Sequence, residues 1–383
     1  VTRAKGLVSP AEESELYEMP VTLQFHLDAE GNGYLSSSSS ITQAKAFVLQ
    51  NYRYQPEKKA LTFSGLTPIV IWQSPGMGEI LFSEQHPIKQ FDTDGPSSKP
   101  LGWTRAKLKD FQLDSPTTTR DKTQIGQQLL ASAQLDSQGN GAVSGVIKPY
   151  LQQETLHPYP LAYVSIQNFQ LQNNLISLAE PIQSKQTPMA WFHTQAGLLL
   201  YQTEQAIWKL KAIKQEIIQS PEIDLGQSLT PPLAHLDQQG NGVIALQTSA
   251  YQWSLHRIEK YNWINSQKLE VKHRFDRKHQ MVVFADKGVI LSHNHMNWPS
   301  PSPDVELELS YFELAQKRGD QEVQKDAQVK RSQFLRFPLN GRFPRGLTVH
   351  LTPQGQGLLA IGSSAKGAAE GKIHLFPIKD FGL

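Results

Sequence analysis

The feature that most constrains the fold of this 383-residue chain is a short motif that recurs along it. The motif reads Leu-Asp-x-x-Gly-Asn-Gly and occupies residues 27–33, 135–141 and 236–242, with a degraded fourth copy at 351–357. Recurrence at a roughly constant spacing is the sequence signature of repeat architectures, in which each repeat is one supersecondary unit. The chain is therefore expected to consist of copies of one small unit.

Each copy of the motif lies between two short runs of apolar and β-branched residues, such as 21–27 before the first copy and 243–246 after the third. Two strand-like runs joined by an Asp/Gly/Asn cluster predict a β-hairpin. Asp accepts hydrogen bonds from backbone N–H groups two residues on, while Gly and Asn tolerate the positive φ of a tight turn.

Three weaker hairpins lie between the four strong ones, and a glycine marks each of the seven turns. The markers are Gly33, Gly78, Gly141, Gly197, Gly242, Gly288 and Gly357. Most hairpins are followed by an alternating segment that ends in an aromatic residue, as in 46–52 and 162–169. With a short strand ahead of each hairpin, the unit has four strands in about 45–55 residues, which is the size of a propeller blade. The sequence thus predicts an all-β fold, a single β-propeller of about seven four-stranded blades over residues 21–383.

The segment before the first blade, residues 1–20, has no clear alternation and is predicted to be an N-terminal tail or linker. A propeller ring needs a junction between its first and last blades. The sequence leaves two routes open: face-to-face packing of these blades, or a short strand near Leu16 and Tyr17.

Composition argues against several classes of function. The 37 basic and 35 acidic residues give a net charge of +2, which is a poor basis for binding nucleic acid. The absence of cysteine excludes disulfides, thiolate metal sites and a cysteine nucleophile, and it fits export to an oxidising compartment. No apolar run reaches the roughly 18 residues that a membrane-spanning helix needs.

The unit of strand, Asp-x-x-Gly-Asn-Gly turn, strand and aromatic-ended strand resembles the blade repeats of exported bacterial propeller proteins of unassigned function. It departs from them at one point, because those repeats place a Trp four or five residues after the turn, where this chain has Ser36, Ser144 and Leu246. The resemblance implies a propeller fold and a periplasmic or extracellular location. It implies no active site. The N-terminal tail adds the option of a membrane tether.

The three motif aspartates, Asp28, Asp136 and Asp237, have three interpretations. They could bind calcium, act as a carboxylate pair like that of glycosidases, or form the turns. Calcium takes six to eight oxygen ligands, and one Asp and one Asn per loop fall short of that. A catalytic pair is usually the exception within a repeat, whereas these residues recur at one position. The turn-forming role is therefore favoured.

Histidines provide the other candidates. His26, His235 and His350 precede the motif leucine and are expected to form hydrogen bonds between blades rather than to bind a ligand. His293 and His295 share a strand face if residues 293–295 are extended, so both could reach one metal, although no third ligand is evident nearby. A polar strand end leading toward Trp298 is favoured instead.

The remaining candidates lie in insertions at 92–101, 152–160 and 316–332. Propellers place function in long loops on one rim and around the channel. The second insertion contributes His157 and Tyr159, and the third is a mixed charge run that could form a polar docking rim. The candidate binding residues are thus His293, His295, Trp298, His157 and Tyr159. The sequence predicts no catalytic residue, metal site or cofactor.

These observations favour a non-enzymatic protein-binding or scaffolding propeller of the bacterial envelope or exterior, which contacts a protein partner through one rim. The alternative is a carbohydrate-binding or glycan-hydrolysing propeller with aromatics and carboxylates at the channel mouth. Paired carboxylates and an exposed Trp in the channel would favour the alternative, whereas a small or apolar lining would favour the scaffold.

Overall fold

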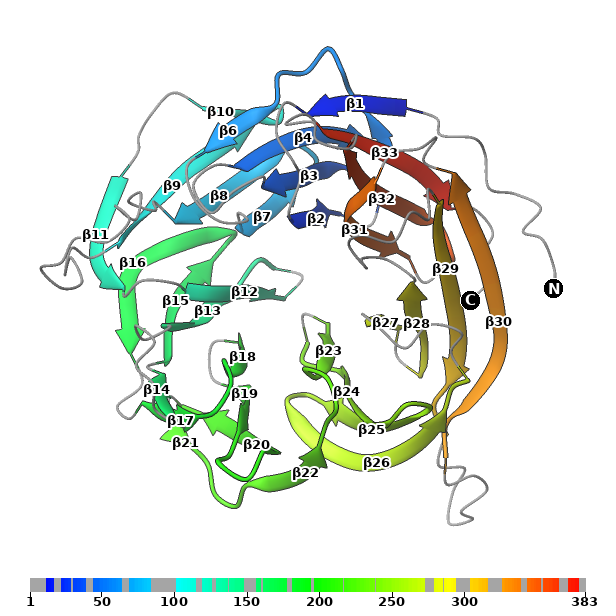
Figure 1. Ribbon diagram of the computed structural model, residues 1–383. Helices are drawn as coiled ribbons and strands as arrows, with labels where there is room; N and C mark the ends of the chain where they lie inside the picture. The colour runs from blue at the N-terminus through cyan, green and yellow to red at the C-terminus, as the bar shows by residue number, and fades with distance from the viewer. Residues whose placement is uncertain are drawn as a thin grey trace, which may run out of the picture.

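The computed structural model places seven β-sheets as blades in a ring around a central channel (Figure 1). The structure describes residues 12–16, 22–28, 30–38, 44–63, 69–83, 101–114, 119–125, 129–136, 138–147, 156–159, 161–177, 181–193, 196–215, 217–237, 239–272, 279–284, 286–293, 304–315, 326–338, 343–352, 354–364 and 371–378. The predicted all-β, seven-bladed propeller is confirmed.

In each blade the chain runs outward from the channel through antiparallel strands, and the blades follow one another around the ring. The first blade consists of β2 (Thr22–Leu27), β3 (Gly33–Ser38), β4 (Ala44–Gln50), β5 (Arg53–Tyr54) and β6 (Leu61–Phe63). The second consists of β7 (Ile69–Ser74), β8 (Met77–Ser83), β9 (Leu101–Lys109), β10 (Gln112–Leu113) and β11 (Thr119–Ile125). The third consists of β12 (Leu129–Leu135), β13 (Gly141–Ile147), β15 (Leu161–Gln167) and β16 (Gln170–Ser177).

The fourth blade consists of β18 (Met189–His193), β19 (Ala196–Gln202), β20 (Ile207–Lys214), β21 (Ile217–Ile218) and β22 (Ile223–Gln227). The fifth consists of β23 (Leu233–Leu236), β24 (Gly242–Ser249), β25 (Gln252–Glu259) and β26 (Asn262–Glu270). The sixth consists of β27 (His279–Phe284), β28 (Lys287–His293), β29 (Asp304–Glu313) and β30 (Gln328–Pro338). The seventh contains β31 (Phe343–Leu351), β32 (Gly357–Ser364) and β33 (Gly371–Ile378).

The outer edges of the blades differ from a strict four-stranded pattern. In the first, second and fourth blades the outermost strand is interrupted, so that two short strands pair with the same third strand. A separate two-stranded sheet pairs β14 (His157–Tyr159), from the connection between β13 and β15 of the third blade, with β17 (Ile182–Ser184), from the connection between the third and fourth blades. The ring is therefore made mainly of four-stranded sheets, with local additions at its periphery.

The ring is closed by the N-terminal segment. Strand β1 (Glu12–Leu16) pairs antiparallel with β33, so that Glu12 lies opposite Leu375 and Leu16 opposite Gly371. Figure 1 shows β1, at the blue end of the colour scale, beside the red β33. Residues 12–16 of the segment predicted as a tail thus form the fourth strand of the last blade, which is the short-strand route to closure.

Apolar residues fill the space between neighbouring blades. Among the described residues, buried side chains form seven clusters, each combining residues of two adjacent blades. In one of them Leu35 and Phe47 of the first blade pack with Leu358 and Leu375 of the seventh. Face-to-face packing therefore joins the first and last blades in addition to the pairing of β1. Both routes to closure are used.

Candidate functional site

The repeated motif forms the turn between the first and second strands of its blade. In the fifth blade the Asp237 carboxylate Oδ1 accepts hydrogen bonds from the backbone N–H groups of Gln239 (2.9 Å) and Asn241 (2.8 Å). The backbone N–H of Asp237 donates to the carbonyl of Asn241 over 2.8 Å. Asp28 and Asp136 accept the same pair of backbone hydrogen bonds in their turns. The aspartates are thus engaged within their own turns.

This first turn also holds the turn between the third and fourth strands of the same blade. The Asn241 side-chain Oδ1 accepts the backbone N–H of Lys260 over 3.0 Å, and the carbonyl of Gly240 accepts the N–H of Tyr261 over 3.0 Å. Lys260 and Tyr261 both have positive φ, as a tight hairpin turn of this kind requires. We call this arrangement the turn clasp; it recurs in the first blade at residues 28–33 with 51–52 and in the third at 136–141 with 168–169.

Glycine and an aromatic ring complete the clasp. Gly240 has φ +76, and a Cβ atom there would lie 2.4 Å from the ring of Tyr261. The aromatic residues at the ends of the predicted alternating segments therefore cover the first turn. The sequence pattern locates these aromatics but does not reveal their role, which depends on a contact between two turns distant in the sequence. The signal that could have identified it is the recurrent aromatic directly after Asn, Asp or Lys.

The histidines before the motif were predicted to form hydrogen bonds between blades, but His26 forms one within its own blade, and His350 meets the neighbouring blade through ring contacts. The His26 Nε2 is 3.0 Å from the Ser36 Oγ, and burial lowers the pKa of His26 to about 4. The His350 ring, in the seventh blade, lies 6.3 Å from the Phe25 ring and 6.0 Å from the Tyr52 ring of the first blade. Burial also lowers the pKa of His235 and of His350. These rings are kept neutral by removal from water.

Serine–histidine pairs recur and were not identified from the sequence. Besides His26 with Ser36, the Ser363 Oγ lies 2.7 Å from the His374 Nε2, and both residues are buried. In the fifth blade His256 lies between Ser254 (3.1 Å) and Ser266 (2.9 Å). Such a pair is the core of nucleophilic catalysis when a substrate can reach it. Here the pairs are repeated and His256 and His374 are buried, which indicates internal hydrogen bonding.

The five predicted binding residues are not brought together by the described structure. His293 ends β28 and is 3% exposed. Tyr159 in β14 is 2% exposed and packs in the core between the third and fourth blades, while His157 is half-buried with its ring 6.4 Å from that of Tyr159. His295 and Trp298 lie outside the described residues. The binding role of this set, and of the metal pair within it, stays a prediction.

A cavity of about 630 Å³ lies against the innermost strands of the fourth to seventh blades. Its lining includes Met189, Leu233, Met281 and Val349, together with His235, His350 and Gln280. No carboxylate and no tryptophan belongs to this lining. The Gln280 side chain donates to the carbonyl of Leu347 over 3.2 Å, so it is committed to the blade contact. This part of the channel is therefore mainly apolar.

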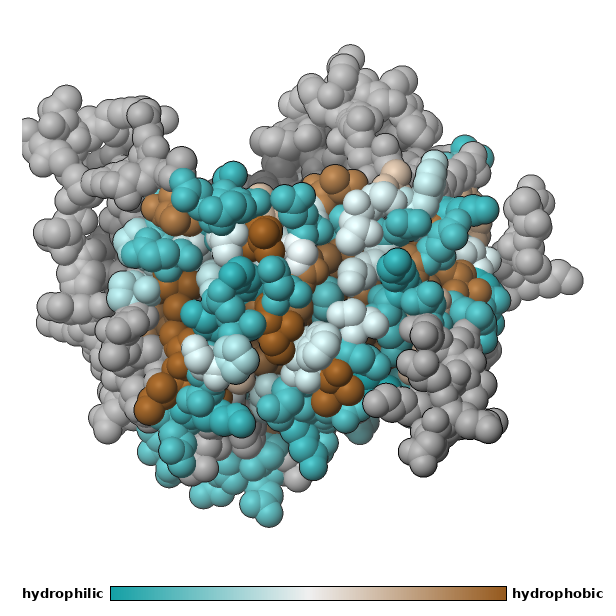
Figure 2. All heavy atoms as spheres, turned by 90° about the horizontal axis from the view of Figure 1, so that it is seen from below, coloured by the Kyte–Doolittle hydropathy of each residue, from teal (hydrophilic) through white to brown (hydrophobic). Residues whose placement is uncertain are grey.

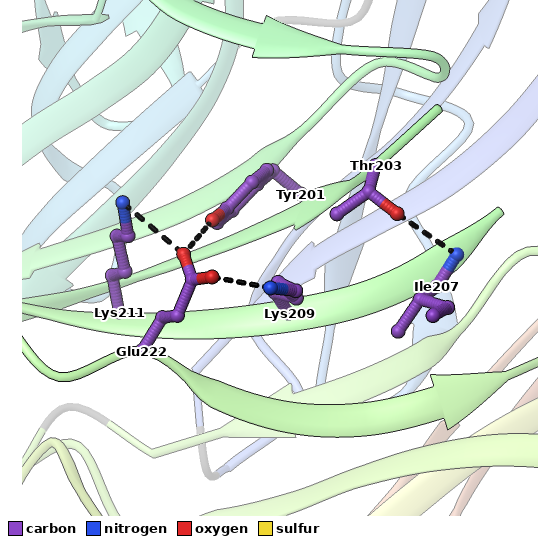
Figure 3. A network of polar contacts seen from close by, with 6 residues as sticks. All are labelled: Tyr201, Thr203, Ile207, Lys209, Lys211 and Glu222. Carbon is purple, nitrogen blue, oxygen red and sulfur yellow. Dashed lines mark hydrogen bonds and ion pairs between the residues drawn. The ribbon is translucent and has the colours of Figure 1, made fainter. Parts of the chain in front are cut away.

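A polar network on the fourth blade joins one carboxylate, two ammonium groups and a phenol (Figure 3). The Glu222 carboxylate, which precedes β22, accepts hydrogen bonds from the Lys209 ammonium and the Tyr201 hydroxyl and pairs with Lys211 over 3.4 Å. The Lys211 ammonium also lies 5.4 Å from the centre of the Tyr201 ring. Glu222 thus ties the interrupted outer strand to β19 and β20.

The network determines how its members ionise. Hydrogen bonds from Lys209 and Tyr201 lower the pKa of Glu222 to about 2. Burial and the Glu222 contact raise the pKa of Tyr201, and the Glu222 contact raises that of Lys209. Carboxylate, ammonium and phenol are therefore each held in their ordinary charge state at neutral pH. A group that stays charged in this way suits strand attachment better than proton transfer, which favours a pKa near the working pH.

The molecular surface carries separated apolar patches. Figure 2 shows the outer wall on the side of the fourth and fifth blades, where hydrophobic patches alternate with hydrophilic side chains. Three exposed apolar residues lie at or beside the turns of the rim that bears the clasps: Met77 (46% exposed), Leu113 (42%) and Ile217 (65%). We call this the turn rim; Leu229 (68%) and Tyr251 (54%) lie in loops of the opposite rim.

Within the described ranges, no three His, Cys, Asp or Glu side chains lie close enough together to hold a metal ion. The described part of the chain likewise contains no helix suited to crossing a membrane.

Comparison with known proteins yields similarity of structure alone. No protein-family model matches the chain, and no curated protein matches its sequence. The WD40 domain of coronin from Toxoplasma gondii matches with a TM-score of 0.42 and 9% identity, over 100% of this chain and 89% of that one. The WD40 domain of SCAP from fission yeast matches with a TM-score of 0.41 and 10% identity, over 94% and 85%.

Prolyl oligopeptidase B from Galerina marginata matches with a TM-score of 0.44 and 8% identity, over 92% of this chain. The chain spans about half the length of that enzyme, 47% of it. The assignment of this protein as a propeller rests on its own sheet topology.

Proposed function

We propose that this protein is a non-enzymatic scaffold that binds a protein partner through one rim of the propeller, at the bacterial envelope or outside the cell. The observation that carries the proposal is the apolar channel cavity, whose lining includes no carboxylate. Glycan hydrolysis needs two carboxylates on either side of the scissile bond. The motif aspartates, which recur in the first, third and fifth blades, accept backbone hydrogen bonds within their own turns.

Of the two rims of the propeller, the turn rim is better supported as the binding surface. It presents exposed apolar side chains on turns that are held by backbone hydrogen bonds, as at Tyr261 with Gly240 and Phe111 with Gly76. Side chains on preorganised turns lose less conformational entropy on binding than side chains on free loops. The predicted docking insertion 316–332 begins in the connection between the third and fourth strands of the sixth blade, which opens on the same rim. Its residues 328–332 belong to β30, and its residues 316–325 lie outside the described ranges.

The cellular location is part of the proposal. It is supported by the absence of cysteine from all 383 residues and by the resemblance of the motif to that of exported propellers.

Two rim variants test the function. Cells are gently cross-linked, the protein is affinity-purified, and co-purifying proteins are identified by mass spectrometry. We expect one stoichiometric protein that is lost from a turn-rim variant, Met77→Ser with Leu113→Ser and Ile217→Ser. The opposite-rim variant, Leu229→Ser with Tyr251→Ser, serves as the matched control and should retain it. A partner retained by the turn-rim variant, or no stoichiometric protein at all, would contradict the proposal.

A further inference from the structure

A second cavity, of about 530 Å³, lies on the turn rim where the fourth and fifth blades meet. One wall comes from the end of β20 and the start of β21, including Lys214 and Ile217. The other wall is the turn of Lys260 and Tyr261 in the fifth blade. Its volume falls within the range of about 300–1,000 Å³ that is typical of ligand pockets. We call it the rim cavity.

The rim cavity combines positive charge with apolar surface. Lys214 and Lys260 are both exposed and both line it, and no Asp or Glu belongs to its described lining. The described ion pairs engage neither lysine, whereas Lys209 and Lys211 nearby in sequence are paired with Glu222. Asp237 is close enough to Tyr261 to influence its ionisation, but its carboxylate accepts hydrogen bonds within its own turn. The described lining of the rim cavity thus carries two positive charges and no negative one, and the Asp237 carboxylate lies outside that lining.

An apolar contact accompanies the charge. Ile217 lines the cavity and is 65% exposed, so a large aliphatic side chain remains in water at its edge. The Tyr261 ring, 5% exposed, closes the side toward the fifth blade. Burying this aliphatic side chain against an apolar group of a ligand favours binding, because it removes apolar surface from water. A ligand that supplies only negative charge would leave this contact unused.

Both walls are held in place without a ligand. On the fifth blade, Lys260 donates its backbone N–H to Asn241 and Tyr261 donates to Gly240. On the fourth blade, Lys214 pairs with Ile217 across the turn, and the Gln219 N–H donates to the carbonyl of Ala212 over 2.8 Å. A preformed site of this kind requires little ordering on binding.

From these observations we infer that the rim cavity binds an acidic segment of the protein partner, in which carboxylates contact Lys214 and Lys260 beside an aliphatic or aromatic side chain that packs on Ile217. The inference rests on the proposed scaffold function and specifies the chemistry of its partner. A peptide is favoured over a nucleic acid for two electrostatic reasons: the cavity offers only two lysines to a polyanion, and the net charge of the chain is only +2. In addition, phosphate groups would make no favourable contact with the apolar side chain of Ile217.

The test uses a phage-displayed library of random heptapeptides selected on the whole protein. We expect enriched sequences to carry Asp or Glu next to Leu, Ile or Phe. Their affinity, measured with synthesised peptides by fluorescence anisotropy, should fall about tenfold in Lys214→Gln with Lys260→Gln. The charge-matched control, Lys185→Gln with Lys272→Gln, removes two exposed lysines elsewhere and should bind as the unmodified protein does.

A second variant keeps the test informative. Ile217→Ser leaves both charges and should weaken the same peptides by about fivefold, with less dependence on salt than the lysine variant shows. Unchanged circular dichroism and thermal midpoints identify variants that fold normally. Enrichment of sequences without acidic residues, equal binding by the lysine variant and its control, or binding of a single-stranded RNA without any acidic peptide would each overturn the inference.

The two proposals fail separately. If the native partner is captured and lost from the turn-rim triple variant while Lys214→Gln with Lys260→Gln retains it and no acidic peptide is enriched, the scaffold stands and the acidic-segment inference is wrong. If acidic peptides bind as expected but no native protein partner is found, the rim cavity is a binding site and the scaffold function is wrong.

Discussion

The second and fifth blades reach the same contact by different turns. In the fifth, the motif turn carries Asp237 and Asn241, and Tyr261 lies over Gly240. In the second, two residues, 75 and 76, join β7 and β8, and no motif aspartate or asparagine is present. Yet the Phe111 N–H donates to the Gly76 carbonyl over 3.0 Å, the distance found for Tyr261 and Gly240. The glycine–aromatic contact is therefore the shared element, and the side-chain hydrogen bonds belong to the longer turn.

The seventh blade extends the comparison. Its degraded motif has Thr352 in place of Asp and Gln356 in place of Asn, and the Gln356 N–H is 3.3 Å from the Thr352 hydroxyl. Its third and fourth strands, β33 and β1, come from opposite ends of the chain, so no turn joins them. Because no turn joins the third and fourth strands of this blade, an asparagine at position 356 would have no backbone N–H of a second turn to accept. The motif side chains are thus absent in the blade that lacks the second turn they would hold.

The largest effect is expected from the glycine of the clasp. Gly240→Ala places a Cβ 2.4 Å from the Tyr261 ring at φ +76, and it should lower the free energy of unfolding by about 3 kcal/mol. Gly226→Ala is the matched control, because Gly226 has φ +98 with nothing within 4 Å of the added Cβ. It should cost about 1 kcal/mol from backbone strain alone. Equal losses in denaturant titrations would show that the ring contact contributes nothing.

The aspartate should matter less than the glycine. Asp237→Ala leaves the N–H groups of Gln239 and Asn241 without their acceptor and should cost about 2 kcal/mol. Gln239→Ala changes an exposed side chain in the same turn while keeping its backbone N–H, and should be within about 0.5 kcal/mol of the unmodified protein. If the two variants unfold at the same denaturant concentration, the side chain does not hold the turn.

Acid should act on the fifth blade at a higher pH than on the fourth. Burial lowers the pKa of His256, in the fifth blade, from 6.5 to about 4. The unfolded chain therefore takes up the proton before the folded one does, so the contribution of this neutral histidine is present above pH 6.5 and is lost as the pH falls toward 4. His256→Gln should flatten the stability profile in this window by about 1–3 kcal/mol, as followed by unfolding at a series of pH values. An unchanged slope would contradict the burial argument.

The fourth blade should respond at lower pH and more weakly. The pKa of Glu222 is lowered from 4.5 to about 2, so the stability that its ionised form provides is present above 4.5 and is lost as the pH falls toward 2. Since this side chain is 36% exposed, solvent screens the pair, and the effect of Glu222→Gln should be below about 1 kcal/mol. Thermal midpoints at pH 2.5 and pH 6 give the comparison. A larger loss in Glu222→Gln at pH 2.5 than at pH 6 would reverse the expected sign.

The sequence predicts the fold well because the turn glycines are local signals. All seven markers, from Gly33 to Gly357, lie in the second strand of a blade, as the hairpin reading requires. The closing strand was foreseen only as one of two options, because residues 12–16 have no repeat partner next to them in sequence. The replacement of the motif Asp and Asn by Thr352 and Gln356 is the one sequence signal that the fourth strand of the last blade does not follow its third strand in the chain.

The candidate sites are harder to predict because burial is set by tertiary packing. Tyr159 is an aromatic residue of the kind that is common at protein interfaces, yet β14 pairs with β17 and the Tyr159 ring packs in the core. The rim cavity joins residues near 214 to residues near 260, two turns that become neighbours only when adjacent blades pack. Neither spacing nor charge pattern along the chain contains that information.

Amide hydrogen exchange tests the turn clasp, the central claim of this account, most directly. In Asn241→Ala the Lys260 N–H loses its side-chain acceptor, while the turn at Asp110 and Phe111 in the second blade has no such acceptor in the unmodified protein. We predict faster exchange at residues 260–262 and unchanged exchange at residues 110–112. Equal exchange rates at residues 260–262 in the variant and the unmodified protein would contradict the turn clasp, and the motif asparagine would then have no demonstrated role.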